Sequence, residues 1–487
     1  MLKLRNREIA TPETLFKLSL NMKQNISLTF FAIIGFIFRV INVDKPFDPV
    51  FDEGYYIRNT LDLIKHGVEF NATAKSYWLV VHPPFGKWML APGIMIFGDN
   101  SFGWRIAAVF WGSLSIVIIG LIAKELFNNL LITSFTAFFM AFDGVAFLSS
   151  RTGILEAPLV FNSLLATLFF IKALKNQKFL PLFGLFMGFA LAVKWNALYQ
   201  LVALVFFYIL YTLPRTYTLL KLRKFKRLLT LKLRFINSFF LIPLLVYILS
   251  WTGWFITKVG QYRDWGSTHP SKYPFIPDVV RSFWHYHVDM LKFHEKLTIP
   301  HPSSAHAYQW LLGYKPTVFY KSGGARCSNQ KFHGMYELCG SVIIQLHNPV
   351  ILYGSLLSIL TIFTILLVKI VRKKFSYKII SRSQDLALSL LVILVLFSYL
   401  PWFAYYKRTT FNYYVDVFMP YLIILLSFVI YKITSLMKKE KTRKYFIYLI
   451  FLLTFGFFAY YYPLYTDHFA SYHYINSRLW LIDNFKI

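Results

Sequence analysis

Two adjacent carboxylates, Asp52 and Glu53, follow closely on the first long apolar stretch of the chain. An acid at the edge of a bilayer is costly to desolvate, so we expect this pair to have a function. One carboxylate can serve as a general base toward a hydroxyl group while the other positions a substrate or a cation. The structural alternative is that both acids cap the amphipathic helix predicted by the spacing of Tyr56, Ile57 and Leu61, whose N-terminal dipole favours negative charge.

A histidine-containing turn follows downstream. In it His82 precedes Pro83 and Pro84, which fix the backbone, and Gly86, which permits a close approach. We expect His82 to bind an anionic or hydroxyl group of a substrate. The alternative is an interfacial turn in which Trp88 lies at the membrane boundary.

Four cations near the ends of apolar stretches are candidates to bind an anionic group: Arg105, Arg151, Lys194 and Arg408. A guanidinium group suits a phosphate because its planar donors match the oxygen geometry. Glu156 and Trp195 lie near two of these cations, and an aromatic ring beside a cation can stack on a sugar. Plainer roles are also open for the four cations, namely snorkelling to lipid headgroups, a structural ion pair, or interfacial anchoring.

Metal binding has weak support. Five histidines are dense in one segment, but they show no HExxH or CxxC spacing; they are His285, His287, His294, His301 and His306. We expect ordinary loop or interface histidines and no required metal or cofactor, although a divalent cation is compatible with the sequence.

The two cysteines, Cys327 and Cys339, lie in one polar segment. If that segment faces an oxidising compartment, they can form a disulfide that closes a short loop. The alternative is a pair of free thiols.

The composition indicates an integral membrane protein. Of its 487 residues 56% are hydrophobic and 20% aromatic, and the mean hydropathy is +0.49, which is typical of a polytopic membrane protein. A net charge of +30 is compatible with binding to nucleic acid. The basic residues instead form short runs between apolar stretches, as in cytoplasmic loops that face anionic lipids. We therefore expect membrane lipids and no nucleic acid as partners.

The apolar stretches predict an all-α fold with about eleven transmembrane helices. They cover 25–43, 103–123, 130–148, 157–174, 179–195, 197–213, 237–257, 349–370, 385–403, 412–433 and 445–463.

The basic runs orient these helices. Segments 1–24, 172–178, 214–234, 372–378 and 438–444 all fall on the cytoplasmic side if the chain starts inside. We expect a cytoplasmic segment 1–24, a transmembrane catalytic domain 25–463 with large outer loops at 44–102 and 258–348, and an extracytoplasmic tail 464–487. The polar residues outside the basic runs then meet on the outer face. A transporter would place such residues at mid-bilayer depth in interrupted helices, so we regard that class as the weaker alternative.

The order of these motifs resembles the protein O-mannosyltransferase family, over about residues 40 to 430. The similar segments are Asp52-Glu53, His82-Pro83-Pro84, Phe102 to Arg105, Ser150-Arg151 to Glu156, Val193-Lys194-Trp195-Asn196 and Arg408 to Phe411. Tyr308, Trp310, Cys327, Cys339 and Asn348 resemble the last large outer loop of bacterial members. Glu156 and Asn196 depart from the family's common aspartate and serine.

The resemblance implies a type-C glycosyltransferase fold with outer amphipathic helices in the plasma membrane. It also implies inverting transfer of mannose from a polyprenyl-phosphate-mannose donor to Ser or Thr hydroxyls of secreted or membrane proteins. On this reading Asp52 is the base, Glu53 and His82 position the base or the acceptor, and the four cations stabilise the leaving phosphate. The alternative is a type-C transferase of another lipid-linked sugar, or one with a lipid or glycan acceptor.

Overall fold

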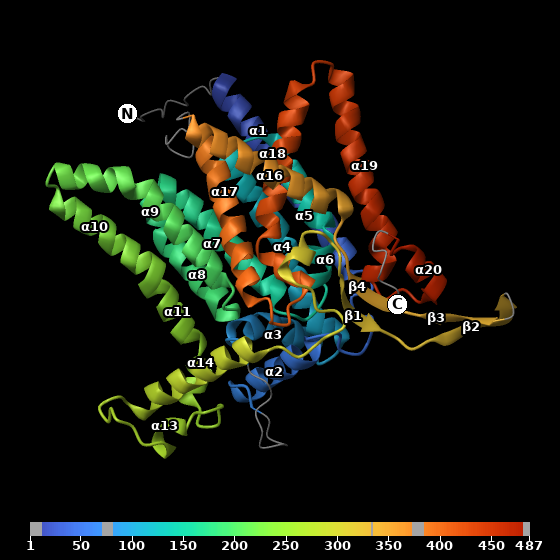
Figure 1. Cartoon of the computed structure of the whole chain (residues 1–487), viewed down its shortest axis with the longest axis horizontal. Coiled ribbons are helices and arrows are strands. Elements are labelled where there is room, and N and C mark those ends of the chain that lie inside the picture. The colour runs from blue at the N-terminus through green and yellow to red at the C-terminus, as the bar shows by residue number, and fades with distance from the viewer. Residues whose placement is uncertain (1–11, 71–80, 333–334, 373–383, 481–487) are drawn as a thin grey trace, which may run out of the picture.

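The computed structural model describes residues 12–70, 81–332, 335–372 and 384–480, and its main part is a bundle of long helices (Figure 1). Among the described residues, nine helices are long and apolar enough to cross a membrane. Each coincides with a predicted span, and the predicted spans 130–148 and 179–195 correspond to the shorter apolar helices Leu130–Phe142 and Gln177–Val193. The prediction of a polytopic helical membrane protein is therefore confirmed.

The bundle is built around two buried helices, α4 and α7, which pack against each other. Its long helices are α1 (Pro12–Val40), α4 (Ser101–Phe127), α7 (Glu156–Lys175), α9 (Ala197–Lys221), α16 (Pro349–Val371), α17 (Gln384–Tyr399), α18 (Met419–Leu436) and α19 (Glu440–Tyr465). Helices α10 (Phe225–Ile236) and α11 (Ile242–Ser250) join through one π-helical turn, and α5 (Leu130–Phe142) and α8 (Leu180–Val193) complete the bundle. Asn100 caps α4 by accepting a hydrogen bond from the amide of Gly103 at 3.0 Å.

One predicted span is broken. Helix α5 ends at Phe142, and α6 (Gly144–Ser149) begins after a single intervening residue, Asp143. The Asp143 carboxylate causes the break because it accepts hydrogen bonds from the amides of Val145 and Ala146, both at 3.0 Å, as an N-cap residue does. Hydropathy does not register such a cap, so the sequence predicted one continuous helix over 130–148.

The basic segment 214–234 is helical rather than a loop. Helix α9 continues to Lys221 and α10 begins at Phe225, so the two form a long hairpin whose turn lies at one end of the molecule (Figure 1). The turn between α18 and α19 lies at the top of the same view.

The two segments predicted as large outer loops lie together at the opposite end (Figure 1). They form α2 (Glu53–His66), α3 (Phe85–Phe97), α13 (Trp265–Thr268), α14 (Asp278–Lys296) and α15 (Ala307–Trp310). The short helix α12 (Thr252–Ile256) precedes the second segment, at the end of the predicted span 237–257. Helix α3 packs against α2, α4, α7 and α8, which fixes the first outer segment on the bundle.

Five short strands, which the sequence did not predict, join this outer layer. β1 (Thr317–Lys321) pairs antiparallel with β4 (Val342–Gln345). β3 (Met335–Gly340) pairs with β2 (Ala325–Phe332) and with β5 (Ala470–Ser471), which precedes α20 (Tyr472–Ser477). A disulfide joins Cys327 and Cys339 across β2 and β3, so of the two alternatives for these cysteines the structure shows the bonded one.

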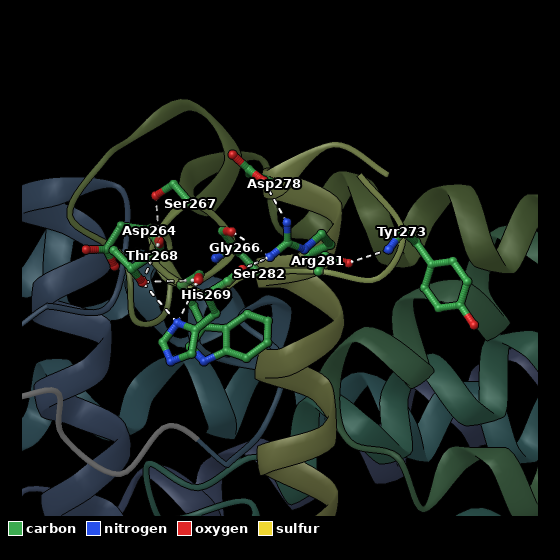
Figure 2. A network of polar contacts seen from close by, with 11 residues as sticks. Asp264, Gly266, Ser267, Thr268, His269, Tyr273, Asp278, Arg281 and Ser282 are labelled. Atoms are coloured by element: carbon green, nitrogen blue, oxygen red, sulfur yellow. Dashed lines mark hydrogen bonds and ion pairs between the residues drawn. The ribbon is translucent and has the colours of Figure 1, made fainter. Parts of the chain in front are cut away.

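Arg281 joins the segment before α14 to that helix through hydrogen bonds and an ion pair (Figure 2). Its Nη2 donates to the carbonyls of Gly266, at 2.7 Å, and of His269, and its Nη1 contacts Asp278 at 3.1 Å. The amide of Gly266 donates to Ser282 Oγ at 2.8 Å. These contacts fix the first half of α14, whose second half reaches the site described next.

Candidate active site

Asp52 lies just before α2 and is its N-cap residue. Its Oδ2 accepts a hydrogen bond from the Tyr413 hydroxyl at 3.3 Å, whereas its Oδ1 accepts none from the described residues. Burial raises the pKa of the Asp52 carboxyl to about 6; Lys194 opposes this shift, Glu156 adds to it and the Tyr413 hydrogen bond opposes it. One oxygen of a partly buried carboxyl is therefore available to accept a proton.

A buried ion pair lies beside Asp52. Lys194, the residue that ends α8, pairs with Glu156 in the first turn of α7, and both side chains are at most 7% exposed. The Lys194 ammonium also lies 5.8 Å from the ring centre of Tyr56 and 5.5 Å from that of Tyr413. Two helix ends and two aromatic rings thus hold one cation close to the candidate base.

A second cation is held by α14. Arg408 Nε donates to the carbonyl of His294 at 2.9 Å, and its Nη2 donates to His294 Nδ1 at 3.2 Å. His294 Nε2 contacts the carbonyl of Val81 at 2.7 Å. Because a guanidinium only donates and a carbonyl only accepts, His294 is neutral with its proton on Nε2. Burial and Arg408 agree with this assignment by lowering the pKa of His294 to about 4.

Arg408 keeps a free donor. Its Nη1 makes no hydrogen bond to the part of the chain that the structure describes, while its guanidinium lies 5.6 Å from the ring of Trp402 and 5.7 Å from that of Tyr414. Nε and Nη2 hold the guanidinium in place, and Nη1 is left to donate to an anion.

His82 stacks on His294, with ring centres 5.2 Å apart, and lies 6.1 Å from Tyr56. Lys87 donates to the carbonyl of His82 at 2.9 Å and pairs with buried Glu69, which fixes the turn before α3. Burial, and then the nearby cations Lys194, Lys87 and Arg408, hold the pKa of His82 well below its ordinary value. A neutral imidazole offers one donor and one acceptor to a hydroxyl group.

Trp195 is oriented by a directional chain of hydrogen bonds. Its Nε1 donates to the Tyr247 hydroxyl at 3.0 Å, and this hydroxyl contacts His287 Nε2 at 2.8 Å. His287 Nδ1 lies 2.7 Å from the carbonyl of Phe283, so the ring carries its proton on Nδ1. The Trp195 ring lies 6.2 Å from that of His294 and so borders the same cluster.

Glu53 and Arg105, in contrast, hold the backbone. All five donors of Arg105 are used: two on Glu53 at 2.9 Å each, and three on the carbonyls of Val43, Pro46 and Asp48 at 2.7 to 3.0 Å. Glu53 also accepts from the amides of Val50 and Gly153. The two side chains are 0% and 1% exposed. Glu53 thus fixes the loop that carries Asp52, which agrees with a role in positioning the base. We correct one prediction: Arg105 has no donor left for a phosphate.

Arg151 is a second correction. Its Nη1 donates to the carbonyls of Phe38, Arg39 and Ile41, and its Nη2 donates to that of Asn42. These carbonyls end α1, where helices leave acceptors without partners and where a cation is favoured. Arg151 therefore closes the end of α1 instead of pairing with an acid or binding a substrate.

Removing either partner of the Glu53–Arg105 pair is expected to destabilise the protein by about 3–5 kcal/mol, because the other charge stays buried and unpaired. We expect Arg105→Met and Glu53→Gln each to lower the apparent Tm of the detergent-solubilised protein. Lys45→Met, at a position in the same loop where the side chain is 41% exposed, is the control and should leave the Tm nearly unchanged. Unchanged Tm values for both buried variants would contradict the structural role.

Sequence reasoning missed His294 as a member of the cluster and treated it as an ordinary loop histidine. Its partners Val81 and Arg408 lie 213 and 114 residues away, so no local spacing could have revealed it. Tyr413, whose hydroxyl bonds Asp52, lies 361 residues away from it and was missed for the same reason.

The fold of the chain is similar to those of known proteins. The chain's fold matches the yeast protein O-mannosyltransferase Pmt1-Pmt2 complex bound to the sugar donor, with a TM-score of 0.73, 12% identity and coverage of 94% of this chain and 92% of that one. It also matches ArnT from Cupriavidus metallidurans bound to undecaprenyl phosphate, with a TM-score of 0.53, 15% identity and coverage of 93% and 69%. The fold is that of the type-C membrane glycosyltransferases.

Sequence comparison narrows this class. A model described as dolichyl-phosphate-mannose-protein mannosyltransferase matches residues 81–240, and one described as the C-terminal four-transmembrane region of protein O-mannosyltransferase matches residues 279–482. The chain is 29% identical to the polyprenol-phosphate-mannose–protein mannosyltransferase of Corynebacterium glutamicum, over 78% of this chain and 76% of that protein. It is 26% identical to that of Mycolicibacterium smegmatis, over 91% and 90%. The chain belongs to the protein O-mannosyltransferase family.

Proposed function

We propose that the chain transfers mannose from polyprenyl-phosphate mannose to Ser or Thr hydroxyls of proteins, with inversion, at the outer face of the membrane. The observation that carries the proposal is the placement of Asp52, with one oxygen free, beside the cation Lys194 in a chain of this family. A second cation, Arg408, is bound to His294, which stacks on His82 in the same cluster. A base and a pair of cations are what a hydroxyl nucleophile and a phosphate leaving group require.

The proposed reaction balances without a general acid. The acceptor oxygen bonds to the anomeric carbon of mannose as the bond from that carbon to the phosphate oxygen breaks. The acceptor proton moves to Asp52, and the leaving polyprenyl phosphate takes the bonding electrons. Lys194 and Arg408 stabilise the negative charge that develops on the phosphate, while the sugar passes an oxocarbenium-like transition state.

His82 and Trp195 are proposed to shape the space around the sugar. The neutral His82 can hydrogen-bond a hydroxyl, and Trp195 can offer its ring to the sugar's C–H face. The positive-inside rule supports an extracytoplasmic site, because the site lies at the end of the bundle opposite the basic α9–α10 turn. We propose that acceptors are met during or after their translocation, in an integral multi-pass protein of the plasma membrane with its N-terminus in the cytoplasm.

The transfer rate is expected to depend on the protonation of Asp52. The pKa of its carboxyl is about 6, and only the deprotonated form can take the acceptor proton. Below that pH the rate should fall about tenfold per pH unit, and above pH 7 it should reach a plateau. The measurement is a pH series of transfer with saturating donor and peptide. A rate that stays constant between pH 7 and pH 5 would contradict the role of Asp52.

A competition between acceptors tests the proposed substrate. Membranes containing the chain are supplied with polyprenyl-phosphate mannose bearing labelled sugar, a Ser/Thr peptide and a glycolipid. The proposal predicts label on the peptide. Label on the glycolipid alone would instead favour the transferase with a lipid or glycan acceptor.

A further inference from the structure

The residue before Asp52 has an unusual backbone. Phe51 has a φ of +49°, in the left-handed region that a bulky side chain rarely adopts. Such strain persists only when the surroundings impose it, and it concentrates at functional sites. The conformation points to a role for the Phe51 ring that a residue with relaxed backbone would not fulfil.

The Phe51 ring is surrounded by four others. Its centre lies 4.9 Å from Phe319, 5.1 Å from Phe411, 5.8 Å from Tyr413 and 6.0 Å from His301. These five side chains form a continuous group, because Phe411 also stacks on Tyr413 at 5.6 Å and contacts His301 at 5.2 Å. We call Phe51, His301, Phe319, Phe411 and Tyr413 the aromatic collar.

A β-bulge aims one member of the collar. In the β1–β4 ladder Val318 faces Ile344 and Tyr320 faces Ile343, so the intervening Phe319 has no partner of its own. Bulges commonly redirect a side chain next to an active site. Here the bulge accompanies the stacking of Phe319 on Phe51, with an interplanar angle of 29°.

Backbone hydrogen bonds hold the rest of the collar. The amide of Thr409 donates to the carbonyl of Leu297 at 2.8 Å, and the amide of Ala305 donates to the carbonyl of Thr410 at 2.8 Å. The segments that carry Phe411 and His301 are therefore tied to each other.

The collar has a buried floor and an accessible rim. Phe319 and Tyr413 are each 4% exposed, whereas Phe51 and Phe411 are partly exposed and His301 is exposed. Phe319 and Tyr413 belong to a buried hydrophobic cluster, against which Phe51 and Phe411 pack. The partly exposed aromatic rim leaves apolar surface next to the reactive carboxyl, and such surface is suited to binding.

Tyr413 is the member of the collar that contacts both Asp52 and the cation Lys194. Tyr413 bonds Asp52 through its hydroxyl, stacks on Phe411 and lies 5.5 Å from Lys194. In an inverting displacement the nucleophile attacks opposite the leaving group. The leaving phosphate binds next to the cations. The acceptor hydroxyl therefore approaches from the opposite side, which is the side of Asp52 that the collar borders.

We propose that the aromatic collar is the acceptor subsite, and that its rim binds an apolar side chain of the polypeptide next to the accepting Ser or Thr. This inference rests on the proposed function. Phe51 is a specificity-determining residue in it: its ring contacts the acceptor, and its backbone presents Asp52 to the hydroxyl.

The test compares two peptides that differ only beside the threonine, one with valine there and one with glycine. Wild-type protein in membranes should show kcat/KM roughly tenfold higher for the valine peptide, the effect of burying one small apolar side chain. Phe51→Gly removes the ring but accepts the positive φ. It and His301→Ala, at an exposed position, should reduce this ratio toward one while the KM for polyprenyl-phosphate mannose stays within about twofold.

Tyr308→Ala is the control, since Tyr308 is exposed in the same outer segment and stacks on His306 instead; it should keep the wild-type ratio. An unchanged ratio in both His301→Ala and Phe51→Gly overturns the proposal. A raised KM for the donor with an unchanged peptide ratio also overturns it and assigns the collar to the sugar. If wild-type protein transfers mannose to no peptide, the proposed function itself has failed, which this design separates from failure of the collar.

Discussion

Asp52→Asn is expected to lower the rate of mannose transfer by about a thousandfold without unfolding the protein. Asparagine has nearly the same shape, and its carbonyl oxygen can still accept the hydrogen bond from Tyr413, which in the wild type is 3.3 Å long. It cannot take up the proton of the acceptor hydroxyl. The measurement is transfer of labelled mannose to a Ser/Thr peptide, with the Tm of the purified variant recorded in parallel.

Asp48→Asn is the matched control, because Asp48 is exposed in the same loop and Arg105 binds its backbone carbonyl rather than its side chain. This variant should retain wild-type transfer. A folded Asp52→Asn protein with near-normal transfer would show that another group takes the proton.

The second large effect is expected from Lys194→Met, which should reduce transfer by about a hundredfold or more. The substitution removes the cation closest to the candidate base and therefore part of the positive charge that the leaving phosphate requires. It also leaves Glu156 buried without its partner, so a loss of stability could produce the same loss of transfer.

A double variant separates these causes. Lys194→Met with Glu156→Gln removes both charges of the pair, so the penalty of an unpaired buried charge disappears. Its Tm is expected to recover toward that of the wild type while transfer stays low. Recovery of transfer together with the Tm would show that Lys194 serves only to neutralise Glu156.

The helical architecture could be predicted from the sequence because the physical signal is local. Runs of about twenty apolar residues mark spans wherever they occur, and the basic segment 214–234 marks one end of the bundle whether it folds as a loop or as a hairpin. The break at Asp143 was missed because one capping carboxylate hardly changes the mean hydropathy of its window. The strands around Cys327 and Cys339 were missed because a large polar segment lacks the alternation that identifies longer strands.

Some residues of the site could be predicted from the sequence, and others could not because their contacts are distant in the chain. Asp52, His82, Lys194, Trp195 and Arg408 stand out as polar or aromatic residues at predicted helix ends, and the structure brings these five together. Glu53, Arg105 and Arg151 stand out in the same way, but Glu53 and Arg105 bond each other and backbone groups, and Arg151 bonds backbone carbonyls. The sequence cannot show these contacts. The pairing of Arg105 with Glu53 spans 52 residues, and the partners of Arg151 are carbonyls that every residue possesses.

The collar could not be predicted from the sequence either. Phe51 is one of 51 phenylalanines, and neither its positive φ nor the bulge that aims Phe319 has a compositional signature. Only the three-dimensional arrangement distinguishes these aromatic residues from those that pack the bundle.

One measurement tests the central claim most directly. Membranes that contain the wild-type chain or Asp52→Asn are given polyprenyl-phosphate mannose with labelled sugar and a Ser/Thr-rich secreted peptide. The account predicts label on the peptide with the wild type and almost none with the variant. Absence of label on the peptide with a well-folded wild type, or equal label with both proteins, would contradict it.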